Sequence, residues 1–296
     1  MNAVIDKPHR GTIFVENAKV LAQEMYPGDQ FVLRLRAPKC AAAAKPGSFV
    51  HITCDPALPM RRPLSIMRVS RDGGVIELLY KAIGEGTRLL AQRREGEVLS
   101  VMGPIGVPFT PDPSRPHALL LGGGVGIPPM VFIADQLRQD KTTTWKPFVI
   151  MGSEVPFPFK VKPSEILVPG VPDGVIGCMP LLDDWGIPSR LASLQGYAGC
   201  HEGYVTDLAR TWLQNLDPAE RDDVAIYSCG PTPMLRTVAA LAREFKLPCQ
   251  VSLEEYMACA VGGCAGCAVK VETENGPAMK RVCVDGPVFD AYAVFV

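Results

Sequence analysis

An apolar strand, a glycine-rich loop and the start of a helix follow one another in HALLLGGGVGIPP, residues 117–129. The helical pattern continues from Met130, with apolar residues recurring at i, i+3, i+4 and i+7. Glycines at such a junction let a phosphate group approach backbone amides at the positive end of the helix. A plain tight turn is the alternative, because glycine loops also occur without ligands.

The same order of elements recurs along the chain. A strand-like run at residues 147–151 follows the helix, and another at residues 225–229 leads through Cys229-Gly230-Pro231 into a helix. Strands that alternate with helices predict a parallel, doubly wound sheet. Ligands of such sheets bind at the carboxyl ends of the strands, where both loops are expected. A simple strand-to-helix turn remains the alternative for the second loop.

The first 110 residues show a different pattern. Short apolar or alternating runs at residues 12–15, 31–35, 48–52 and 75–80 are separated by turn signals, and only the segment after Gly86 has a helical pattern. This spacing predicts an antiparallel barrel or sandwich. Three prolines in residues 111–116 predict a linker to the α/β half. The proline-rich residues 152–190 predict an insertion or a long functional loop.

Within the predicted barrel, Arg61-Arg62-Pro63-Leu64-Ser65-Ile66 places two guanidinium groups in an extended run. Arginine is suited to bidentate phosphate binding, and Gly84-Glu85-Gly86-Thr87 is a glycine turn that opens a helix and can hold phosphate oxygens. The alternatives are a surface salt-bridge pair for the arginines and a capped turn for the glycines.

Four of the ten cysteines lie in the last 38 residues, with C-x4-C-x2-C spacing and then a fourth after fifteen intervening residues. These are Cys259, Cys264, Cys267 and Cys283. The spacing is that of plant-type 2Fe-2S sites. Gly262, Gly263 and Gly266 allow the loop to bend around a cluster and point amides at sulfur. Zinc held by four thiolates is the alternative, although structural zinc sites favour paired C-x2-C knuckles.

Composition excludes several classes of protein. With 30 basic and 31 acidic side chains among 296 residues, the net charge of −1 argues against a strongly basic nucleic-acid binder. A hydrophobic fraction of 47% is ample for packed cores. Residues 1–8 contain no apolar leader, and no apolar run reaches the roughly 20 residues that cross a bilayer. We therefore expect a cytoplasmic protein without a membrane span.

The combination resembles the ferredoxin-NADP reductase superfamily: a barrel with an R-x-x-S motif, then an α/β half with a glycine loop and a C-G-P turn. The cysteine set, with SLEEYMAC at residues 252–259 and CVDGPVF at residues 283–289, is similar to the electron-transfer subunit of type B dihydroorotate dehydrogenases. The resemblance implies an all-β plus α/β fold in three domains. These are an antiparallel FAD-binding β-barrel at 1–112, a parallel NAD-binding α/β domain at 113–250 and a small 2Fe-2S domain at 251–296.

The resemblance also implies which residues hold the cofactors. FAD would be held by Arg62, Pro63, Leu64, Ser65, Gly84, Gly86 and Thr87, and NAD(H) by Gly123, Gly124, Gly126, Pro128, Cys229, Gly230 and Pro231. The four cysteines of the C-terminal loop would hold the cluster. Ser65, near the flavin, and Cys229, near the nicotinamide, are the expected catalytic positions. Glu154 follows the second strand of the α/β half, where a carboxylate accepts from ribose hydroxyls and repels a 2′-phosphate. It favours NADH, although Lys160 and Lys162 lie close by in the sequence.

The function implied is an electron relay between NAD(H), FAD and a 2Fe-2S cluster. Its partner would be a catalytic dehydrogenase subunit, an FMN-containing dihydroorotate dehydrogenase of pyrimidine biosynthesis, in a hetero-oligomer. Two alternatives remain open at the level of sequence. One is the small subunit of an NADH-linked ferredoxin, sulfide or hydrogenase complex. The other belongs to a different class, a non-catalytic tetrathiolate zinc protein with a nucleotide-sensing domain.

Overall fold

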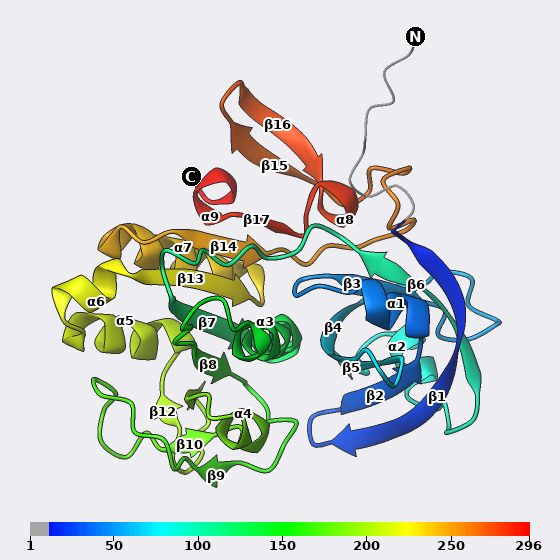
Figure 1. Ribbon diagram of the computed structural model, residues 1–296. Coiled ribbons are helices and arrows are strands. Elements are labelled where there is room, and N and C mark those ends of the chain that lie inside the picture. The colour runs from blue at the N-terminus through cyan, green and yellow to red at the C-terminus, as the bar shows by residue number, and fades with distance from the viewer. Residues whose placement is uncertain (1–11) are drawn as a thin grey trace.

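A closed barrel of six antiparallel strands forms the first part of the chain (Figure 1). The computed structural model describes residues 12–296, so the prediction about a leader at residues 1–8 lies outside the described residues. The barrel order is β1-β2-β5-β4-β3-β6. The strands are β1 (Phe14–Tyr26), β2 (Gln30–Arg36), β3 (Phe49–Ile52), β4 (Arg62–Ser70), β5 (Val75–Lys81) and β6 (Val98–Ile105). The predicted barrel is confirmed.

Alternating side chains fill the barrel interior. Leu33 and Leu35 of β2 and Ile76 and Leu78 of β5 are fully buried there, as the period of two along a strand requires. Two short helices accompany the strands, α1 (Pro38–Ala43) and α2 (Glu85–Leu90). The prediction of a single helix in this half was wrong. Proline in the first turn followed by a run of alanines makes α1 a favourable helix despite its length.

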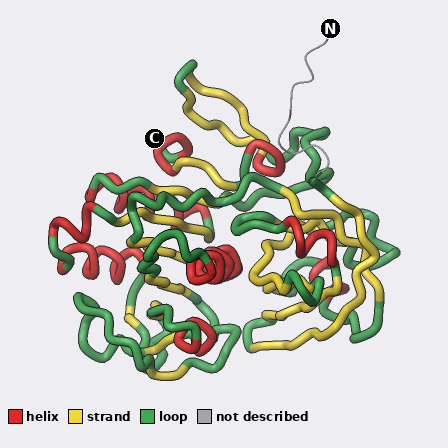
Figure 2. Tube along the Cα trace, in the orientation of Figure 1, coloured by secondary structure: helices red, strands yellow, loops and turns green. Residues whose placement is uncertain are grey.

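A seven-stranded sheet forms the α/β part, in the order β12-β11-β8-β7-β13-β14-β17 (Figures 1 and 2). All neighbours are parallel except β14 and β17. The strands are β7 (His117–Gly123), β8 (Phe148–Gly152), β11 (Ser189–Ser193), β12 (His201–Glu202), β13 (Val224–Cys229), β14 (Cys249–Ser252) and β17 (Val288–Asp290). The predicted parallel sheet is confirmed.

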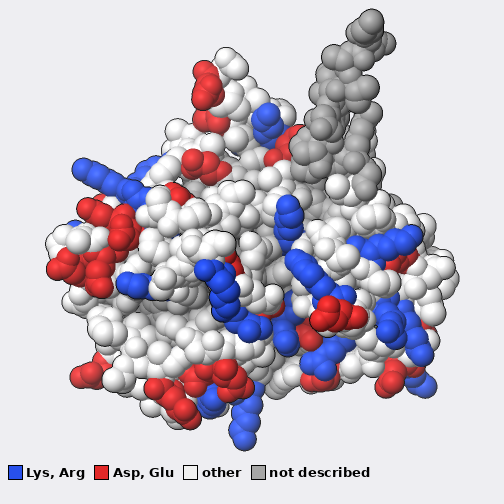
Figure 3. Space-filling view, viewed as in Figure 1, with Lys and Arg blue, Asp and Glu red and all other residues white. Residues whose placement is uncertain are grey.

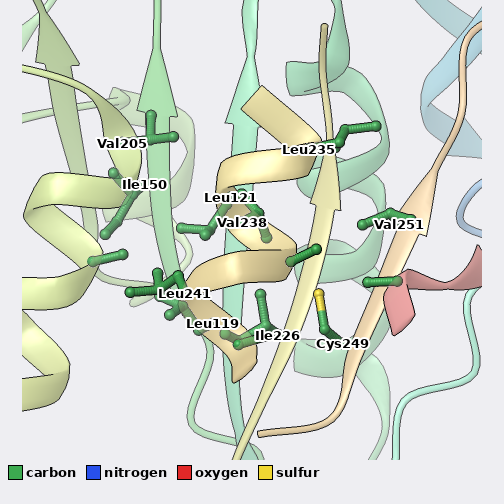
Figure 4. Packing of buried hydrophobic residues seen from close by; sticks show 14 of the residues in the cluster. Leu119, Leu121, Ile150, Val205, Ile226, Leu235, Val238, Leu241, Cys249 and Val251 are labelled. Atoms are coloured by element: carbon green, nitrogen blue, oxygen red, sulfur yellow. The ribbon is translucent and has the colours of Figure 1, made fainter. Parts of the chain in front are cut away.

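Helices cover both faces of this sheet. The 3-10 turn η1 (Gly124–Gly126) leads into α3 (Ile127–Gln139) on one face, while α5 (Val205–Asn215) and α7 (Thr232–Phe245) pack on the other, with α6 (Pro218–Asp222) beside them. Figure 4 shows Leu119, Leu121 and Ile226 of the sheet packed against Val238 and Leu241 of α7. Each central strand is therefore buried on both sides, which is typical of parallel sheets.

The proline-rich residues 152–190 form a small folded insertion. They contain β9 (Lys162–Pro163) paired with β10 (Gly177–Cys178), and α4 (Pro180–Asp184). The predicted boundary was too long, because residues 189 and 190 already belong to the central strand β11. The insertion also touches the barrel: the Gln30 side-chain amide donates to the carbonyl of Pro156 at 2.7 Å.

The last 46 residues leave the sheet and return to it. After β14 comes the cysteine loop, then a hairpin of β15 (Ala268–Thr273) and β16 (Gly276–Arg281), α8 (Val282–Asp285), β17 and α9 (Ala291–Val294). The backbone amide of Val107, just past the barrel, donates to the carbonyl of Gly286 at 2.6 Å. The cysteine segment is therefore attached both to the barrel and to the sheet.

No helix in residues 12–296 is long and apolar enough to cross a membrane. Charged side chains of both signs are spread over the surface (Figure 3). On the face shown there, acidic side chains gather over α6, which carries Glu220 and Asp222. This mixed surface fits the near-neutral net charge.

Candidate functional site

The first part of the candidate site is formed by the start of β4 and the turn before α2. A Cβ atom built on Gly86 would lie 2.8 Å from Nε of Arg62, so the guanidinium rests against the glycine backbone. The hydroxyl of Thr87 accepts from the amide of Gly84 at 3.1 Å and closes the turn. The structure thus brings together two motifs that lie more than twenty residues apart, as a phosphate-binding pair requires.

The two arginines have different roles. Arg61 donates to the carbonyls of His51 and Ser100 at 3.1 and 2.8 Å and ties β3 to β6. Arg62 donates only to nearby backbone carbonyls, those of Met60 and Arg61. Among the described residues neither forms a salt bridge, so the alternative of a surface ion pair is not what the structure shows. Arg62 therefore keeps a charge that an anionic ligand can use.

Successive side chains of β4 point alternately into the barrel and out of it, so the residues predicted to bind FAD lie on two different faces. Leu64 is 9% exposed and packs with Ile66 inside the barrel core. Pro63, Ser65 and Met67 lie on the outer face, where Met67 joins the core formed with α3. Ser65 is half-buried on this face, which turns toward the α/β part. Leu64 thus shapes the barrel wall, and Ser65 is the residue of the motif placed toward a ligand between the two parts.

The two glycine loops touch backbone to backbone at the carboxyl edge of the sheet. A Cβ on Gly126 would lie 2.2 Å from the carbonyl oxygen of Cys229, and a Cβ on Gly123 would lie 2.4 Å from Sδ of Met234. Gly124 has a φ of +55° and nothing within 4 Å of a Cβ position. Only glycine allows this approach, and the open side at Gly124 leaves room for a ligand. Pro128 is buried in the first turn of α3.

A carboxylate that sequence reasoning missed lies beside the second loop. Oε1 of Glu254, which follows β14, is 4.0 Å from Sγ of the buried Cys229. Burial, and then the Glu254 charge, raise the pKa of the Cys229 thiol well above its usual range, so this thiol is neutral. Glu254 reaches solvent on one side, yet burial by the surrounding protein raises the pKa of its carboxyl. Its position directly after a strand at the carboxyl edge was the available signal.

Glu154 is exposed just after β8, at the same edge. Lys162 forms ion pairs with Asp183 and Asp184 at 3.4 and 3.3 Å, which occupies its charge within the insertion. Lys160 is exposed and has no ion pair among the described residues. Of the two lysines that left the choice of nicotinamide open, only Lys160 therefore keeps an available charge.

An apolar cavity of about 740 Å³ lies between the insertion and the β1–β2 turn. Tyr26, Phe157, Phe159 and Tyr197 supply its aromatic walls. None of the residues predicted to bind FAD, NAD(H) or the cluster lines this cavity. It belongs to the insertion and stands apart from the two motifs predicted to bind phosphate.

The cysteine loop bends as the glycines were expected to permit, and two alanines take part in the bend. Ala260, Gly262 and Ala265 have positive φ angles between 54° and 78°. The amide of Cys264 donates to Sγ of Cys259, and the amide of Gly266 donates to Sγ of Cys264, both at 3.4 Å. Amides aimed at sulfur are the arrangement that stabilises thiolates and tunes clusters.

The loop favours thiolate at its first cysteine. Burial raises the pKa of the Cys259 thiol, but the amides of Val261, Cys264 and Gly263 outweigh it and lower the pKa to about 7. Burial and the side chain of Cys267 raise the pKa of the Cys283 thiol to about 12. Metal ligation requires deprotonated thiols, so binding at these residues would release protons.

The Cys259 and Cys264 side chains are neighbours, as are those of Cys267 and Cys283, and Cys259 is close enough to act electrostatically on Cys283. Within residues 12–296, no group of three or more His, Cys, Asp or Glu side chains is drawn together tightly enough to hold a metal ion. Arg281, which sequence reasoning missed, supports the loop: it donates to the carbonyl of Gly262 and pairs with Asp285 at 3.1 Å. The donor set is the all-sulfur set that iron-sulfur clusters use.

Residues 254–295 match the family model described as the iron-sulfur cluster binding domain of dihydroorotate dehydrogenase B. One similar solved structure is an NADH-dependent reduced ferredoxin-NADP oxidoreductase described in connection with flavin-based electron bifurcation. It has a TM-score of 0.74 and 26% sequence identity, and the match covers 94% of this chain and 90% of that one. A ferredoxin NADP+ reductase from Neisseria gonorrhoeae, with a TM-score of 0.57 and 15% identity, covers 78% of this chain and 91% of its own and shows the fold alone. Fold and site define a reductase of the ferredoxin-NADP reductase type that carries an iron-sulfur domain.

Curated relatives give the particular family. The dihydroorotate dehydrogenase B (NAD(+)) electron transfer subunit of Desulforamulus reducens is 32% identical over 290 residues, covering 95% of this chain and 98% of its own length. That of Caldanaerobacter subterraneus subsp. tengcongensis is 32% identical over 249 residues, covering 84% and 86%. The chain belongs to the family of electron transfer subunits of dihydroorotate dehydrogenase B.

Proposed function

We propose that this chain relays electrons between NAD(H), FAD and a 2Fe-2S cluster for a catalytic subunit that oxidises dihydroorotate. One observation carries the proposal: the cysteine segment is attached both to the barrel and to the edge of the nucleotide sheet. Val107 donates to Gly286, and the amide of Leu253 donates to the carbonyl of Pro287 at 2.9 Å. A cluster in this segment would therefore lie beside both the barrel and the sheet, which supports electron transfer between ligands of the two parts.

The barrel residues fit FAD. The unpaired guanidinium of Arg62 against Gly86 and the closed turn at Gly84 and Thr87 form a cradle for a diphosphate, which a Cβ at position 86 would fill. When bound, FAD takes electrons in pairs from a nicotinamide and passes them singly to an iron-sulfur cluster. Ser65 faces the space between the two parts and would hydrogen bond to the flavin edge.

The sheet residues fit NAD(H). Gly123, Gly124 and Gly126, with Pro128 at the start of α3, form the phosphate loop, while Cys229, Gly230 and Pro231 form the neighbouring turn. The neutral Cys229 thiol and Glu254 would position the nicotinamide from the sheet side. Glu154 would accept from the ribose hydroxyls and disfavour the extra phosphate of NADPH.

We divide the chain into a FAD-binding domain at 1–112, an NAD-binding domain at 113–250 and a cluster domain at 251–296. Contacts cross the last boundary, since β14 spans it and β17 adds an antiparallel strand to the sheet. The NAD-binding and cluster domains would therefore act as one rigid unit. The ligands of the cluster would be Cys259, Cys264, Cys267 and Cys283, because they supply four sulfur donors, three on the cysteine loop and one on α8 after the β15–β16 hairpin.

The partner follows from the family. The curated relatives are electron transfer subunits by name, which implies a separate catalytic subunit that binds dihydroorotate. We propose that this chain forms a hetero-oligomer with such a subunit, which carries FMN, in pyrimidine biosynthesis, and that the complex is cytoplasmic.

A second candidate has one specific observation in its favour. The chain aligns over 94% of its length with the NADH-dependent reduced ferredoxin-NADP oxidoreductase at 26% identity. The same relay would then serve another partner, as in an NADH-linked ferredoxin, sulfide or hydrogenase complex. Because this sequence identity is lower than the 32% shared with the dihydroorotate dehydrogenase subunit, we prefer dihydroorotate dehydrogenase as the partner.

An anaerobic titration of the purified protein with NADH tests the proposal. We expect visible absorption from both a flavin and an iron-sulfur cluster, and bleaching of both by NADH. A colourless protein that contains zinc would overturn the relay. Purification of the native complex then separates the two candidates, because a dihydroorotate-oxidising flavoprotein supports the first and a hydrogenase or sulfur-reducing subunit supports the second.

A further inference from the structure

The cavity beside the insertion is built from three segments that are distant in sequence. Figure 1 shows the insertion, with β9, β10 and α4, beside the β1–β2 turn of the barrel, and both of these segments line the cavity. The third segment is the loop between β11 and β12, which holds Tyr197. The cavity of about 740 Å³ has the size of a small-molecule pocket, for which roughly 300–1,000 Å³ is usual.

Hydrogen bonds hold these walls in place. The side-chain amide of Gln30, a residue that is 1% exposed, donates to the carbonyls of Pro27 and Pro156 at 2.8 and 2.7 Å. It ties the barrel turn to the insertion. The amide of Gly177 donates to the carbonyl of Gly199 at 2.7 Å and ties β10 to the third segment. The walls are therefore already formed, so a ligand would not have to order them on binding.

The walls are aromatic and apolar. Phe157 stacks on Phe159 with ring centres 5.4 Å apart, and the Tyr197 ring meets Phe157 at 6.5 Å and 66°. Phe157 is 4% exposed, whereas Phe159, Tyr197 and Tyr26 are only half-buried and keep ring surface for a ligand. Aromatic side chains contact another flat ring in offset-stacked or edge-to-face arrangements. The walls therefore fit a planar aromatic group.

One positive charge at the cavity has no partner. Within residues 12–296, Lys160 and Lys162 are the only charged residues that line the cavity, and no carboxylate does. Lys162 is held in its ion pairs with Asp183 and Asp184. Lys160 is exposed and forms no ion pair in the described part of the chain. An ammonium group at this place attracts an anionic ligand and repels a cationic one.

We propose that this cavity is a binding site for a small planar aromatic acid, with its ring against Phe159 and Tyr197 and its acidic group at the Lys160 ammonium. None of the residues assigned to FAD, NAD(H) or the cluster lines the cavity, so the site is separate from the electron relay. The ligand bridges the barrel turn and the insertion, because both supply walls. The inference goes beyond the proposed function and does not depend on it.

Isothermal titration calorimetry of the purified full chain with 2-naphthoate tests the site, and 2-naphthamide offers the same two rings without the charge. We expect 2-naphthoate to bind at one site per chain, about three- to fivefold more tightly than the amide, as for one partly exposed ion pair. Lys160→Ala should abolish this preference and leave the binding of the amide unchanged. Lys39→Ala is the matched control and should keep the preference, since Lys39 on α1 is also exposed and lies outside the cavity.

Tyr197→Ala tests the aromatic wall. It should weaken the binding of both compounds about tenfold, because each loses a ring contact and the apolar area buried with it. Tyr204→Ala is the control, since Tyr204 is 63% exposed and does not line the cavity. Circular dichroism verifies that each variant is folded, and Phe159→Leu takes the place of Tyr197→Ala if that variant is not.

An excess of NADH should leave the affinity for 2-naphthoate unchanged. Displacement of 2-naphthoate by NADH would make the cavity part of the nucleotide site and overturn the inference. The absence of binding by the wild-type chain would overturn it as well. So would a preference for the acid that persists in Lys160→Ala, or an unchanged affinity in the wall variant.

Discussion

The contact between Arg62 and Gly86 shows how the absence of a side chain makes room for a guanidinium group beside a turn. The guanidinium occupies the space that any side chain at position 86 would need. Within residues 12–296 this guanidinium forms no ion pair, and it donates to the carbonyls of Met60 and Arg61 beside the turn. Sequence alone marked both residues, but only the packing shows that each depends on the other.

Gly86→Ala should therefore weaken FAD binding. The new Cβ would push the Arg62 guanidinium away from the turn and remove a charge-assisted hydrogen bond worth about 1.5–3 kcal/mol, or roughly 10- to 100-fold in Kd. Fluorescence titration of the flavin-free protein with FAD measures the change. Gly263→Ala is the control, since Gly263 lies in the cysteine loop, outside the residues assigned to FAD, and its Cβ would meet nothing within 4 Å. Equal losses in both variants would contradict the packing argument.

Glu254 should make stability depend on pH. Burial raises the pKa of its carboxyl, so the folded state holds this proton more tightly than the unfolded state does. Its contribution to stability is complete below the unfolded pKa and is lost as the pH rises through the folded pKa. The side chain introduced by Glu254→Gln cannot ionise, so the thermal stability of this variant relative to wild type should improve as the pH rises above the ordinary range of a glutamate carboxyl.

Differential scanning fluorimetry across this pH range checks the sign of the effect. The neighbouring Glu255 supplies the control, because Glu254 and not Glu255 lies against the buried Cys229 thiol, and Glu255→Gln should follow wild type at every pH. A difference for Glu254→Gln that shrinks as the pH rises would show that the carboxyl is not desolvated in the folded protein.

Among the elements, the insertion connects parts of the molecule that are distant in sequence. Trp185, at the end of α4, lies between Arg138 of α3 and Arg68 of β4, whose guanidinium carbons are 4.3 and 5.3 Å from the ring centre. The ring therefore joins the insertion, the sheet helix and the barrel. An unstructured loop would not hold two cations against one indole.

Trp185→Ala should lower the free energy of unfolding by about 1–3 kcal/mol, from two cation–π contacts and the lost packing. The loss should appear in urea denaturation followed by intrinsic fluorescence and by flavin release. Leu167→Ala in the same insertion is the control, since Leu167 is 92% exposed and should leave stability unchanged. A Trp185→Ala protein as stable as wild type would show that the insertion does not connect the parts.

At the scale of the whole molecule, the cysteine segment exposes several large apolar side chains. Tyr256 is 95% exposed at the entry to the cysteine loop, and Val261 within the loop and Met279 on β16 are exposed as well. Solvent-exposed apolar side chains around the cysteine loop are typical of a surface that docks another protein. The catalytic subunit is the partner that this surface would contact.

Tyr256→Ser combined with Val261→Ser should weaken the complex at least about tenfold, because exposed aromatic and apolar anchors dominate such interfaces. Co-purification and analytical ultracentrifugation with the catalytic subunit measure the complex, and visible absorption verifies that flavin and cluster remain. Val15→Ser, an exposed apolar residue on the barrel strand β1, should leave the complex intact. Full assembly by the double variant would place the interface elsewhere.

The sequence by itself determined the barrel, the parallel sheet and the cysteine spacing. These features depend on the hydrophobic periodicity of each segment, on the residues at the turns and on the number of residues between the cysteines, and all three can be read from the sequence. It also placed both glycine loops at one edge, because the carboxyl ends of parallel strands meet there. The short helix α1 and the end of the insertion at β11 were misread, since a six-residue helix and a strand after many prolines leave little periodic signal.

Only the tertiary structure decided which residues meet. Glu254 with Cys229, Arg281 with the cysteine loop, and His51 with Met257 are contacts between segments separated by 19 to more than 200 residues. No period or spacing encodes such pairs, because they arise from how the barrel, the sheet and the returning C-terminal segment pack on one another. Packing also decides charge, since the same histidine or glutamate titrates differently once it is buried.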